Sequence, residues 1–317
     1  MSAITFRHYL PGDEPGIVSL WNRCLTWDPV TELRFRKLVL LDPNFDPHGM
    51  RIAVRGGSVV GVFYSIRRRL PMLGTELESD KGWVPFFFVD PDCRREGVAT
   101  RLLEDAMAFM RANKRETLLF SGYAPNYIVP GIDRSGYPAG AAFLDKAGFQ
   151  RNYTAVAMDY HLVPFDIPED VRQLKKQRIS EGYSFATAAD RDLYELIQFA
   201  TDHFNSDWGR AIREGLLQNL TMQQILVARH HGELVGFCLH GGYEGVRERF
   251  GPFGVDSGQR GKGIGKILLY DCLYLMRSQG MHGAWFLWTG EQSAAGQLYK
   301  KLGFNISRSF DVVSRSL

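Results

Sequence analysis

The chain has 317 residues, which at roughly 150 residues per domain suggests two domains. Apolar residues make up 45% and charged residues 23% of the chain, a composition that excludes intrinsic disorder, and four widely spaced cysteines exclude a disulfide scaffold. A net charge of +3 is too weak to indicate nucleic-acid binding, and the longest apolar run, residues 84–89, is too short to cross a membrane. With no secretory signal and no metal-ligand spacing, we expect a cytoplasmic protein with reduced thiols and no metal.

In the first half, the pattern predicts a strand, one or more helices, a hairpin, a strand, a Gly-bearing turn, a helix, a strand, a helix and a last strand. Residues 51–62 read as two strands joined by the Gly56-Gly57 turn. A strand ends at Phe88-Val89, and apolar residues at helical spacing begin at Val98. An insertion rich in Pro and Gly, residues 130–138, precedes the last helical segment.

Residues 163–180 are the predicted linker, because two prolines and the basic stretch 175–178 separate one set of elements from the next. The predicted domains are therefore residues 1–162 and residues 181–317.

The second half repeats the first. At a constant offset of 166, the stretch 88–103 recurs as 254–269, with these identities: Val89/Val255, Asp90/Asp256, Arg94/Arg260, Gly97/Gly263, Leu102/Leu268 and Leu103/Leu269. Residues 225–237 repeat the hairpin, and residues 298–304 repeat residues 143–149. A chance likeness of two amphipathic helices would not also reproduce the loop before them, so an internal duplication is indicated.

Each repeat places a basic, Gly-bearing loop between a strand and a helix. Unpaired N–H groups at a helix N-terminus attract anions, and glycine lets a phosphate approach the backbone. A P-loop is excluded because Ile267 follows Lys266, and the dinucleotide fingerprint lacks its third glycine. The alternative is an ordinary strand-to-helix turn with solvated lysines.

The loop pattern Arg/Gln-x-x-Gly-x-Gly/Ala at residues 260–265 and 94–99 resembles the pyrophosphate loop of the GNAT N-acetyltransferase superfamily. Residues 298–304 resemble the family's Tyr-x-x-x-Gly-Phe signature, and residues 283–289 are similar to a segment of two-domain glucosamine or glucosaminide N-acetyltransferases. The resemblance covers nearly the whole chain as two copies. It implies an α/β fold with two GNAT-like domains, each a mixed β-sheet that is flanked by helices and splayed between its fourth and fifth strands.

The resemblance further implies acetyl-CoA as the cofactor, with its pyrophosphate on the loop amides and its pantetheine along the fourth strand. In the second half the implied cofactor residues are Phe253, Gly254, Val255, Arg260, Gly261, Lys262, Gly263, Ile264, Gly265, Lys266 and Gln292. In the first half they are Phe88, Val89, Arg94, Arg95, Gly97, Val98, Ala99 and Thr100. We expect a monomer or homodimer that acts on a small-molecule amine and binds neither nucleic acid nor membrane.

Direct acetyl transfer needs an acid for the departing thiolate and a base for the amine. Tyr299 occupies the position of the family's acid, although a core tyrosine that caps the last helix is the alternative. The equivalent residue of the first half is Leu144, which cannot donate a proton, so turnover is assigned to the second half. Glu248 is the candidate base, and a surface glutamate is equally consistent with its neighbours; Asp207, Glu244 and Glu291 are weaker candidates.

Aromatic residues Trp285 and Trp288, together with Trp208 and Tyr243, indicate an acceptor with apolar faces, such as an amino sugar. An amino acid, a polyamine or an antibiotic amine is also consistent with the sequence. A second class of function is a sensor or scaffold whose two domains bind acyl-CoA without turnover.

Overall fold

The computed structural model describes residues 2–317, and their contacts divide the chain into two compact units. Unit 1 comprises Met1–Pro71, Glu76–Ala155 and Arg308–Leu317, and unit 2 comprises Met72–Thr75 and Val156–Ser307. Two long strands, β6 (Gln150–His161) and β12 (Asn305–Ser316), each contribute to both units.

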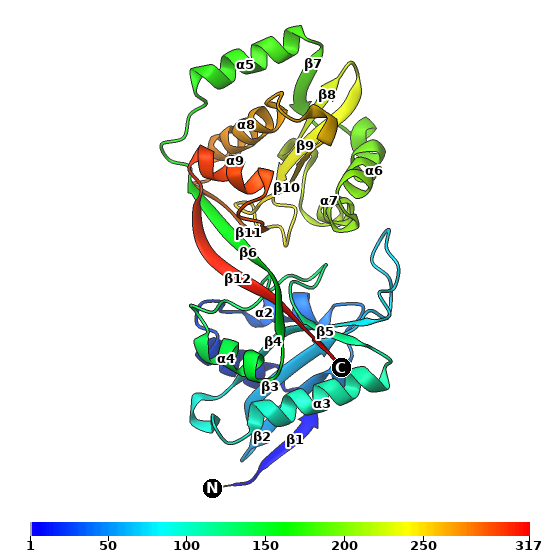
Figure 1. Ribbon diagram of the computed structural model, residues 1–317, viewed down its shortest axis with the longest axis vertical. Coiled ribbons are helices and arrows are strands. Elements are labelled where there is room, and N and C mark those ends of the chain that lie inside the picture. Colours follow the sequence, from blue (N-terminus) through cyan, green and yellow to red (C-terminus); the bar gives the residue numbers. More distant parts are fainter. Residues whose placement is uncertain (1) are drawn as a thin grey trace. The chain divides into compact units, whose positions relative to one another are not determined.

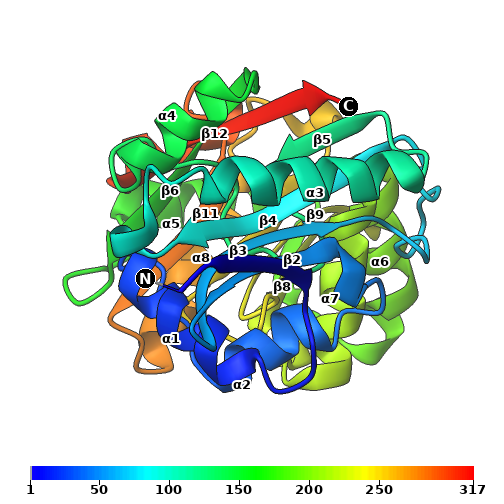
Figure 2. The same ribbon diagram turned by 90° about the horizontal axis from the view of Figure 1, so that it is seen from below.

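Unit 1 follows the predicted order of elements (Figure 1). Its elements before β6 are β1 (Ile4–His8), α1 (Glu14–Cys24), α2 (Glu32–Phe35), β2 (Met50–Arg55), β3 (Ser58–Ile66), β4 (Lys81–Val89), α3 (Val98–Ala112), β5 (Thr117–Phe120) and α4 (Pro138–Lys146). Strands β1 to β4 form an antiparallel meander, and β5 pairs in parallel with β4. Helices α1 and α2 lie on one face of this sheet and α3 on the other (Figure 2).

Each face of the unit 1 sheet carries its own apolar core. Trp21 of α1 packs against Phe86 and Phe88 of β4, and the apolar stripe of α3 covers the opposite face. The residues predicted to form that stripe, Val98, Leu102 and Ala106 among them, are buried, as helical spacing requires.

The sheet of unit 1 is completed by the last strand of the chain. Strand β12 pairs antiparallel with β5 from Val313↔Phe120 to Ser316↔Thr117. Phe310, Val312 and Val313 are almost completely buried there, so removal of apolar surface from water holds the strand in place. The insertion of residues 130–138 is fastened to the same strand, since Ile132 and Asp311 exchange two backbone hydrogen bonds of 2.9 Å.

Unit 2 repeats the same plan. Its elements are α5 (Glu169–Ser180), β7 (Tyr183–Thr187), α6 (Leu193–His203), α7 (Ser206–Gln218), β8 (Ile225–His230), β9 (Glu233–His240), β10 (Phe250–Val255), α8 (Ile264–Ser278), β11 (Gly283–Thr289) and α9 (Ala294–Leu302). Strands β7 to β10 form an antiparallel sheet, whereas β11 pairs with the second part of β6, from Gly283↔His161 to Thr289↔Val156.

The apolar faces predicted for the helices that follow the two Gly-bearing loops, α3 and α8, are buried as expected. Both predicted hairpins, β2–β3 and β8–β9, and the mixed α/β class are confirmed. The contact-based division differs from the predicted boundaries in two respects. Residues 308–317 join unit 1, and the predicted linker, residues 163–180, contains helix α5 of unit 2. Pro168 stands at the N-cap of α5, and Val171 is buried, which accounts for a helix in a stretch that reads as a connection.

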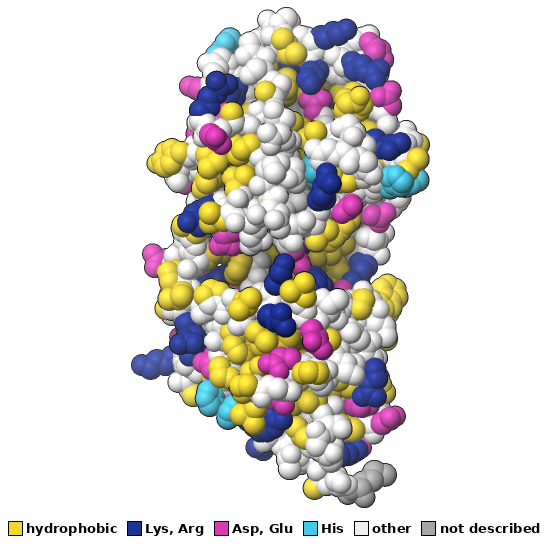
Figure 3. All heavy atoms as spheres, turned by 180° about the vertical axis from the view of Figure 1, so that it is seen from behind, with side chains coloured by type: hydrophobic (Ala, Val, Ile, Leu, Met, Phe, Trp, Pro, Cys, Tyr) yellow, Lys and Arg dark blue, Asp and Glu magenta, His cyan; other side chains and the backbone are white. Residues whose placement is uncertain are grey.

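Within residues 2–317, no helix combines the length and the hydropathy that a membrane crossing requires. On the face of the molecule drawn in Figure 3, basic and acidic side chains are interspersed.

Candidate functional site

In each unit the fourth and fifth strands separate shortly after they meet. In unit 1, β4 and β5 pair in parallel from Lys81↔Thr117 to Trp83↔Leu119, while β4 continues to Val89. In unit 2, one parallel bridge, Arg249↔Trp285, and a 3.0 Å hydrogen bond from the Trp285 amide to the Glu248 carbonyl join the strands, and β10 and β11 then belong to different sheets. The predicted splay is therefore present twice.

The two Gly-bearing loops have the same backbone conformation. Gly97 and Gly263 both adopt left-handed φ values, +81° and +78°, at the N-cap of the following helix. Two residues earlier, Arg95 has φ +66° and Gly261 has φ +78°. The carboxylates of Asp90 and Asp256 each accept the amide two residues ahead, at 3.1 and 2.8 Å. The duplication seen in the sequence thus extends to the path of the chain.

Both loops have the chemistry of an anion cradle. The N-cap glycines of α3 and α8 offer no side chain to accept the first-turn amides, which also lack partners within their helices. Arg94 and Arg95 are exposed beside the first loop, and Lys262 and Lys266 lie at the second. Unpaired amides, the positive end of a helix dipole and nearby cations suit a pyrophosphate.

The second loop is covered by helix α5, which the sequence did not predict. Arg178 donates from Nε to the Lys262 carbonyl at 2.6 Å, and Asp170 pairs with the Lys266 ammonium at 2.7 Å. Leu174 lies above the loop glycine, since a Cβ atom on Gly263 would be 2.7 Å from Leu174 Cδ2. In the part of the chain that the structure describes, no atom lies within 4 Å of the corresponding position at Gly97.

Three predicted cofactor residues of unit 2 meet on one small surface. A Cβ atom on Gly265 would lie 3.3 Å from the ring of Phe253 and 3.6 Å from the side chain of Val255, with Leu298 of α9 beside them. Gly265 therefore gives β10 and α9 close access to the first turn of α8. The opposite side of β10 is closed at Gly254, where the ring of Phe204 packs on the bare backbone.

Tyr299, the predicted acid, lies on α9 and is only 6% exposed. Its ring contacts those of Phe286 and Phe253, with centroids 4.6 and 6.1 Å away, and burial raises its pKa well above the ordinary value. The signature ends with Gly303, whose φ of +103° terminates α9, and with Phe304, whose ring packs against Tyr299. The equivalent residue of unit 1, Leu144, lies on α4 and is buried in the core cluster to which α3 contributes.

Two other predicted site residues lie at the surface. Glu248 is exposed, and its carboxylate takes part in no hydrogen bond or ion pair among residues 2–317. Its backbone nevertheless marks the point from which β10 and β11 separate. Gln292 is exposed as well, and its side chain accepts a 3.0 Å hydrogen bond from Gln297.

A polar and aromatic cluster occupies the start of the splay in unit 2. The Arg249 guanidinium lies 4.6 Å from the ring centroid of Tyr243 and 5.7 Å from that of Trp285, and it pairs with Glu244 at 3.1 Å. The Tyr243 hydroxyl donates to Asp207 at 3.1 Å. Tyr243 and Trp285 were predicted from the sequence to face the acceptor, and Asp207 and Glu244 were weaker candidates for the base. Arg249 was not predicted, because its neighbours Arg247 and Glu248 are typical of a solvent-exposed stretch.

The remaining acceptor candidates lie elsewhere in unit 2. Trp208 stacks on Phe204 at 4.9 Å, and Trp288 is half-exposed. Glu291 pairs with Lys300 at 3.2 Å. Among residues 2–317 no group of three or more His, Cys, Asp or Glu side chains is arranged to hold a metal ion.

Two family models, both described as an acetyltransferase (GNAT) domain, match residues 5–138 and 222–306. One similar solved structure is a GCN5-related glucosamine N-acetyltransferase region of a fungal multi-domain GH3 β-N-acetylglucosaminidase, with 16% identity, a TM-score of 0.80 and coverage of 99% of this chain. This chain spans 38% of that protein. The comparison with curated proteins found no match.

Two further structures match along their whole length. A GCN5-related N-acetyltransferase from Sphaerobacter thermophilus has 18% identity and a TM-score of 0.70, with coverage of 99% of this chain and 95% of that one. A tandem GNAT protein from the clavulanic acid biosynthesis pathway has 17% identity and a TM-score of 0.65, with coverage of 99% and 98%. At these identities the likeness shows the fold.

The family matches show the class of enzyme to which the repeated splay and the two Gly-bearing loops belong, the acetyltransferases. The two family matches together cover more than half of the chain, which belongs to the GNAT acetyltransferases and carries two domains of that family. Members of this family generally take the acetyl group from acetyl-CoA.

Proposed function

We propose that unit 2 transfers the acetyl group of acetyl-CoA to the primary amine of a small molecule, of which an amino sugar is the favoured class. One observation carries the proposal. The buried ring of Tyr299 lies against Phe253, and the ring of Phe253 lies against Gly265 of the anion cradle. Phe253 of β10 thereby connects the proposed proton donor on α9 with the proposed pyrophosphate site at the start of α8.

Each part of this arrangement has a distinct task. The amides at the start of α8, with Lys262 and Lys266, would hold the pyrophosphate, and the backbone of residues 253–255 would pair with the pantetheine. Bound acetyl-CoA supplies an activated thioester. The Tyr299 hydroxyl is protonated at neutral pH, as the phenol of any tyrosine is, and it can donate its proton to sulfur as the C–S bond breaks and the new C–N bond forms. We assign the removal of the amine proton to Glu248.

The acceptor is proposed to bind at the start of the splay. Tyr243 and Trp285 provide aromatic faces for the C–H side of a sugar ring. Glu244 and Asp207, which are paired with Arg249 and Arg210 respectively, provide carboxylate oxygens that can accept hydrogen bonds from the polar groups of the sugar. The similarity to a structure described as a glucosamine N-acetyltransferase region supports the same class.

The second candidate is a non-catalytic acyl-CoA sensor or scaffold. It is favoured by unit 1, where the buried Leu144 takes the position of the acid and cannot donate a proton while the Gly-bearing loop keeps the same backbone conformation as in unit 2.

The test is a thiol-release assay of the full chain with acetyl-CoA and a panel that includes glucosamine, amino acids, polyamines and aminoglycosides. Tyr299→Phe should lower turnover toward the low end of the roughly 10²–10⁴-fold range of acid–base assistance, because a thiolate leaves readily. Its affinity for acetyl-CoA should not change. Tyr274→Phe, an exposed change of the same chemistry on α8, is the matched control.

The possible outcomes separate the two candidates. Binding of CoA without thiol release for any amine supports the sensor. Wild-type turnover by Tyr299→Phe contradicts the role of Tyr299.

A further inference from the structure

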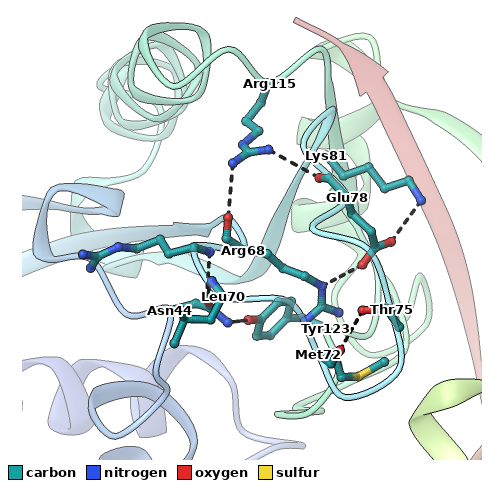
Figure 4. Close-up of polar contacts among 10 residues, drawn as sticks. Asn44, Arg68, Leu70, Met72, Thr75, Glu78, Lys81, Arg115 and Tyr123 are labelled. Atoms are coloured by element: carbon teal, nitrogen blue, oxygen red, sulfur yellow. Dashed lines mark hydrogen bonds and ion pairs between the residues drawn. The ribbon is translucent and has the colours of Figure 1, made fainter.

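We propose that unit 1 contains a binding site for the carboxylate group of a small molecule, built by Arg68 and Tyr64 at the start of the β4–β5 splay. Figure 4 shows Arg68 with its hydrogen-bond partners Glu78 and Arg115. This proposal is independent of acetyl transfer by unit 2. It rests on the geometry of the buried side chains described next.

Arg68 lies two residues after the end of β3, and its charged side chain is buried, with only 3% of the residue exposed. Its guanidinium lies 5.1 Å from the ring centroids of both Trp83 and Tyr123. Its Nε donates to Glu78 at 2.6 Å. Trp83 is the residue at which β4 leaves β5, and Tyr123 follows the end of β5, so Arg68 lies where the strands begin to separate.

Two donors of this cluster are unused. Within residues 2–317, neither Nη1 of Arg68 nor the hydroxyl of Tyr64 has a hydrogen-bond partner, and Tyr64 is 2% exposed. Tyr64 belongs to the same core cluster as Trp83 and Tyr123, the two rings against which the Arg68 guanidinium lies. The Asp42 carboxylate interacts electrostatically with both Arg68 and Tyr64. Buried polar groups are nearly always paired, so two unpaired donors near one carboxylate indicate a missing acceptor.

The acceptors around these donors are already engaged. Asp42 accepts from the Asn44 amide at 2.7 Å and from the Asn126 side chain at 2.6 Å. The Asn44 side chain donates to the Tyr123 hydroxyl at 2.9 Å and accepts two backbone amides, those of Arg69 and Leu70. The cluster therefore needs a partner that brings acceptor oxygens.

The two unpaired donors favour an acceptor that carries negative charge. Glu78 is shared between Arg68 and Lys81, and Arg115 donates to the Arg68 carbonyl at 3.2 Å. Burial raises the pKa of Asp42, which disfavours its negative form. Asp46 acts on Tyr64 and Asp80 acts on Arg115, and Asp46 is itself paired with Arg67 at 3.3 Å. A hydrogen bond from a guanidinium is stronger to an anion than to a neutral acceptor, so an anion is the partner that suits Arg68 Nη1.

A carboxylate fits this setting better than a phosphate. The walls are the rings of Trp83, Tyr123 and Phe86, which cannot solvate a second negative charge. A carboxylate is planar and singly charged, it matches the edge of a guanidinium, and it accepts a phenolic hydrogen bond with its other oxygen. A dianion would be costlier to remove from water.

The experiment uses the full chain labelled with ¹⁵N at its tryptophan indoles. The Trp83 resonance is assigned from Trp83→Phe, and sodium acetate is titrated at constant ionic strength against chloride, with inorganic phosphate in a parallel arm. We expect a saturable shift of the Trp83 signal with acetate, with a Kd on the order of 1 mM for so small a ligand. Tyr64→Phe and Arg68→Met should each abolish saturation.

Thermal melting of Tyr64→Phe provides a second readout that does not need a ligand. Because the Tyr64 hydroxyl lacks a partner, its removal should leave the Tm unchanged or raise it. The matched control is Tyr137→Phe, which should lower the Tm because the Tyr137 hydroxyl donates to Asp28 at 2.7 Å. Three results would each overturn the proposal: no saturation with acetate, saturation with phosphate alone, or a fall in Tm for Tyr64→Phe equal to that of Tyr137→Phe, which would reveal a buried water as the partner.

Discussion

The guanidinium of Arg308 donates to both carboxylate oxygens of Asp28, at 2.7 and 3.0 Å, although the two residues are 280 positions apart. Its Nε also donates to Asp133 at 2.8 Å, and the Tyr137 hydroxyl donates to Asp28. Asp133 and Tyr137 belong to the insertion of residues 130–138 and its edge. The insertion thus serves to anchor β12 in unit 1, a role that its composition does not reveal.

Arg308→Met should destabilise unit 1 substantially. Removal of one partner leaves Asp28 and Asp133 without their cation, and breaking a buried pair in this way typically costs about 3–5 kcal/mol. Chemical denaturation followed by circular dichroism measures the effect. Arg151→Met is the control. The Arg151 side chain is exposed and lies 3.9 Å from Asp311, and an exposed ion pair of this kind contributes about 0–1 kcal/mol to stability. Equal losses for the two variants would contradict the anchoring role.

Asp170→Asn should strengthen the binding of acetyl-CoA to unit 2. The change frees the Lys266 ammonium, which would then meet the pyrophosphate without a competing carboxylate. Because the Asp170–Lys266 pair is exposed and screened by solvent, the gain in affinity should be at most a few-fold and should shrink at high salt.

Isothermal titration calorimetry with acetyl-CoA measures this gain. Asp166→Asn, which removes an exposed partner of Arg172 outside the loop, is the matched control and should have no effect. Weaker binding by Asp170→Asn would show that α5 supports the site instead of covering it.

The two loop glycines should respond differently to valine. In Gly265→Val the added carbons meet Phe253 and Val255 on the proposed pantetheine side, so turnover should be lost. In Gly97→Val the side chain meets no neighbour in the described chain, and the left-handed φ of +81° is the main cost, about 1–2 kcal/mol of stability.

Acetyl transfer by the two purified, folded variants distinguishes the roles of the units. Loss of turnover in Gly97→Val together with normal turnover in Gly265→Val would place catalysis in unit 1.

His240 should make the stability of unit 2 depend on pH. Its side chain is fully buried, Nδ1 donates to the Arg247 carbonyl at 2.9 Å, and Nε2 has no partner in residues 2–317. Burial is the main cause that lowers the pKa of His240 below its ordinary value of 6.5. The unfolded chain therefore takes up the proton first as the pH falls, and the free energy of unfolding decreases from about pH 6.5 downward until the folded pKa is reached.

His240→Asn retains a donor for the Arg247 carbonyl and removes the titrating group. Its Tm should be lower at pH 8 but should fall less between pH 7 and 5 than that of the wild type. Parallel slopes in this range would refute the assignment.

The duplication, the order of elements in each half and the positions of the two Gly-bearing loops follow from the amino-acid sequence alone. These features are local: helical and strand periodicity, a turn of two glycines, and glycines at positions where φ is positive, as at Gly97 and Gly263. Tyr299 could be singled out as a candidate as well, because the signature that contains it ends only five residues later, with Gly303 and Phe304.

Only the tertiary structure decided which groups meet across the chain. Strand β12 joins unit 1 because the burial of Phe310 and Val313 and the ion pairs of Arg308 act over more than a hundred residues of separation. Helix α5 covers its loop through Asp170, Leu174 and Arg178, and Arg68 meets Trp83 and Tyr123 from three different segments. Periodicity records which side of an element is apolar, whereas the partner of a buried charge depends on which elements pack together, and no local pattern carries that information.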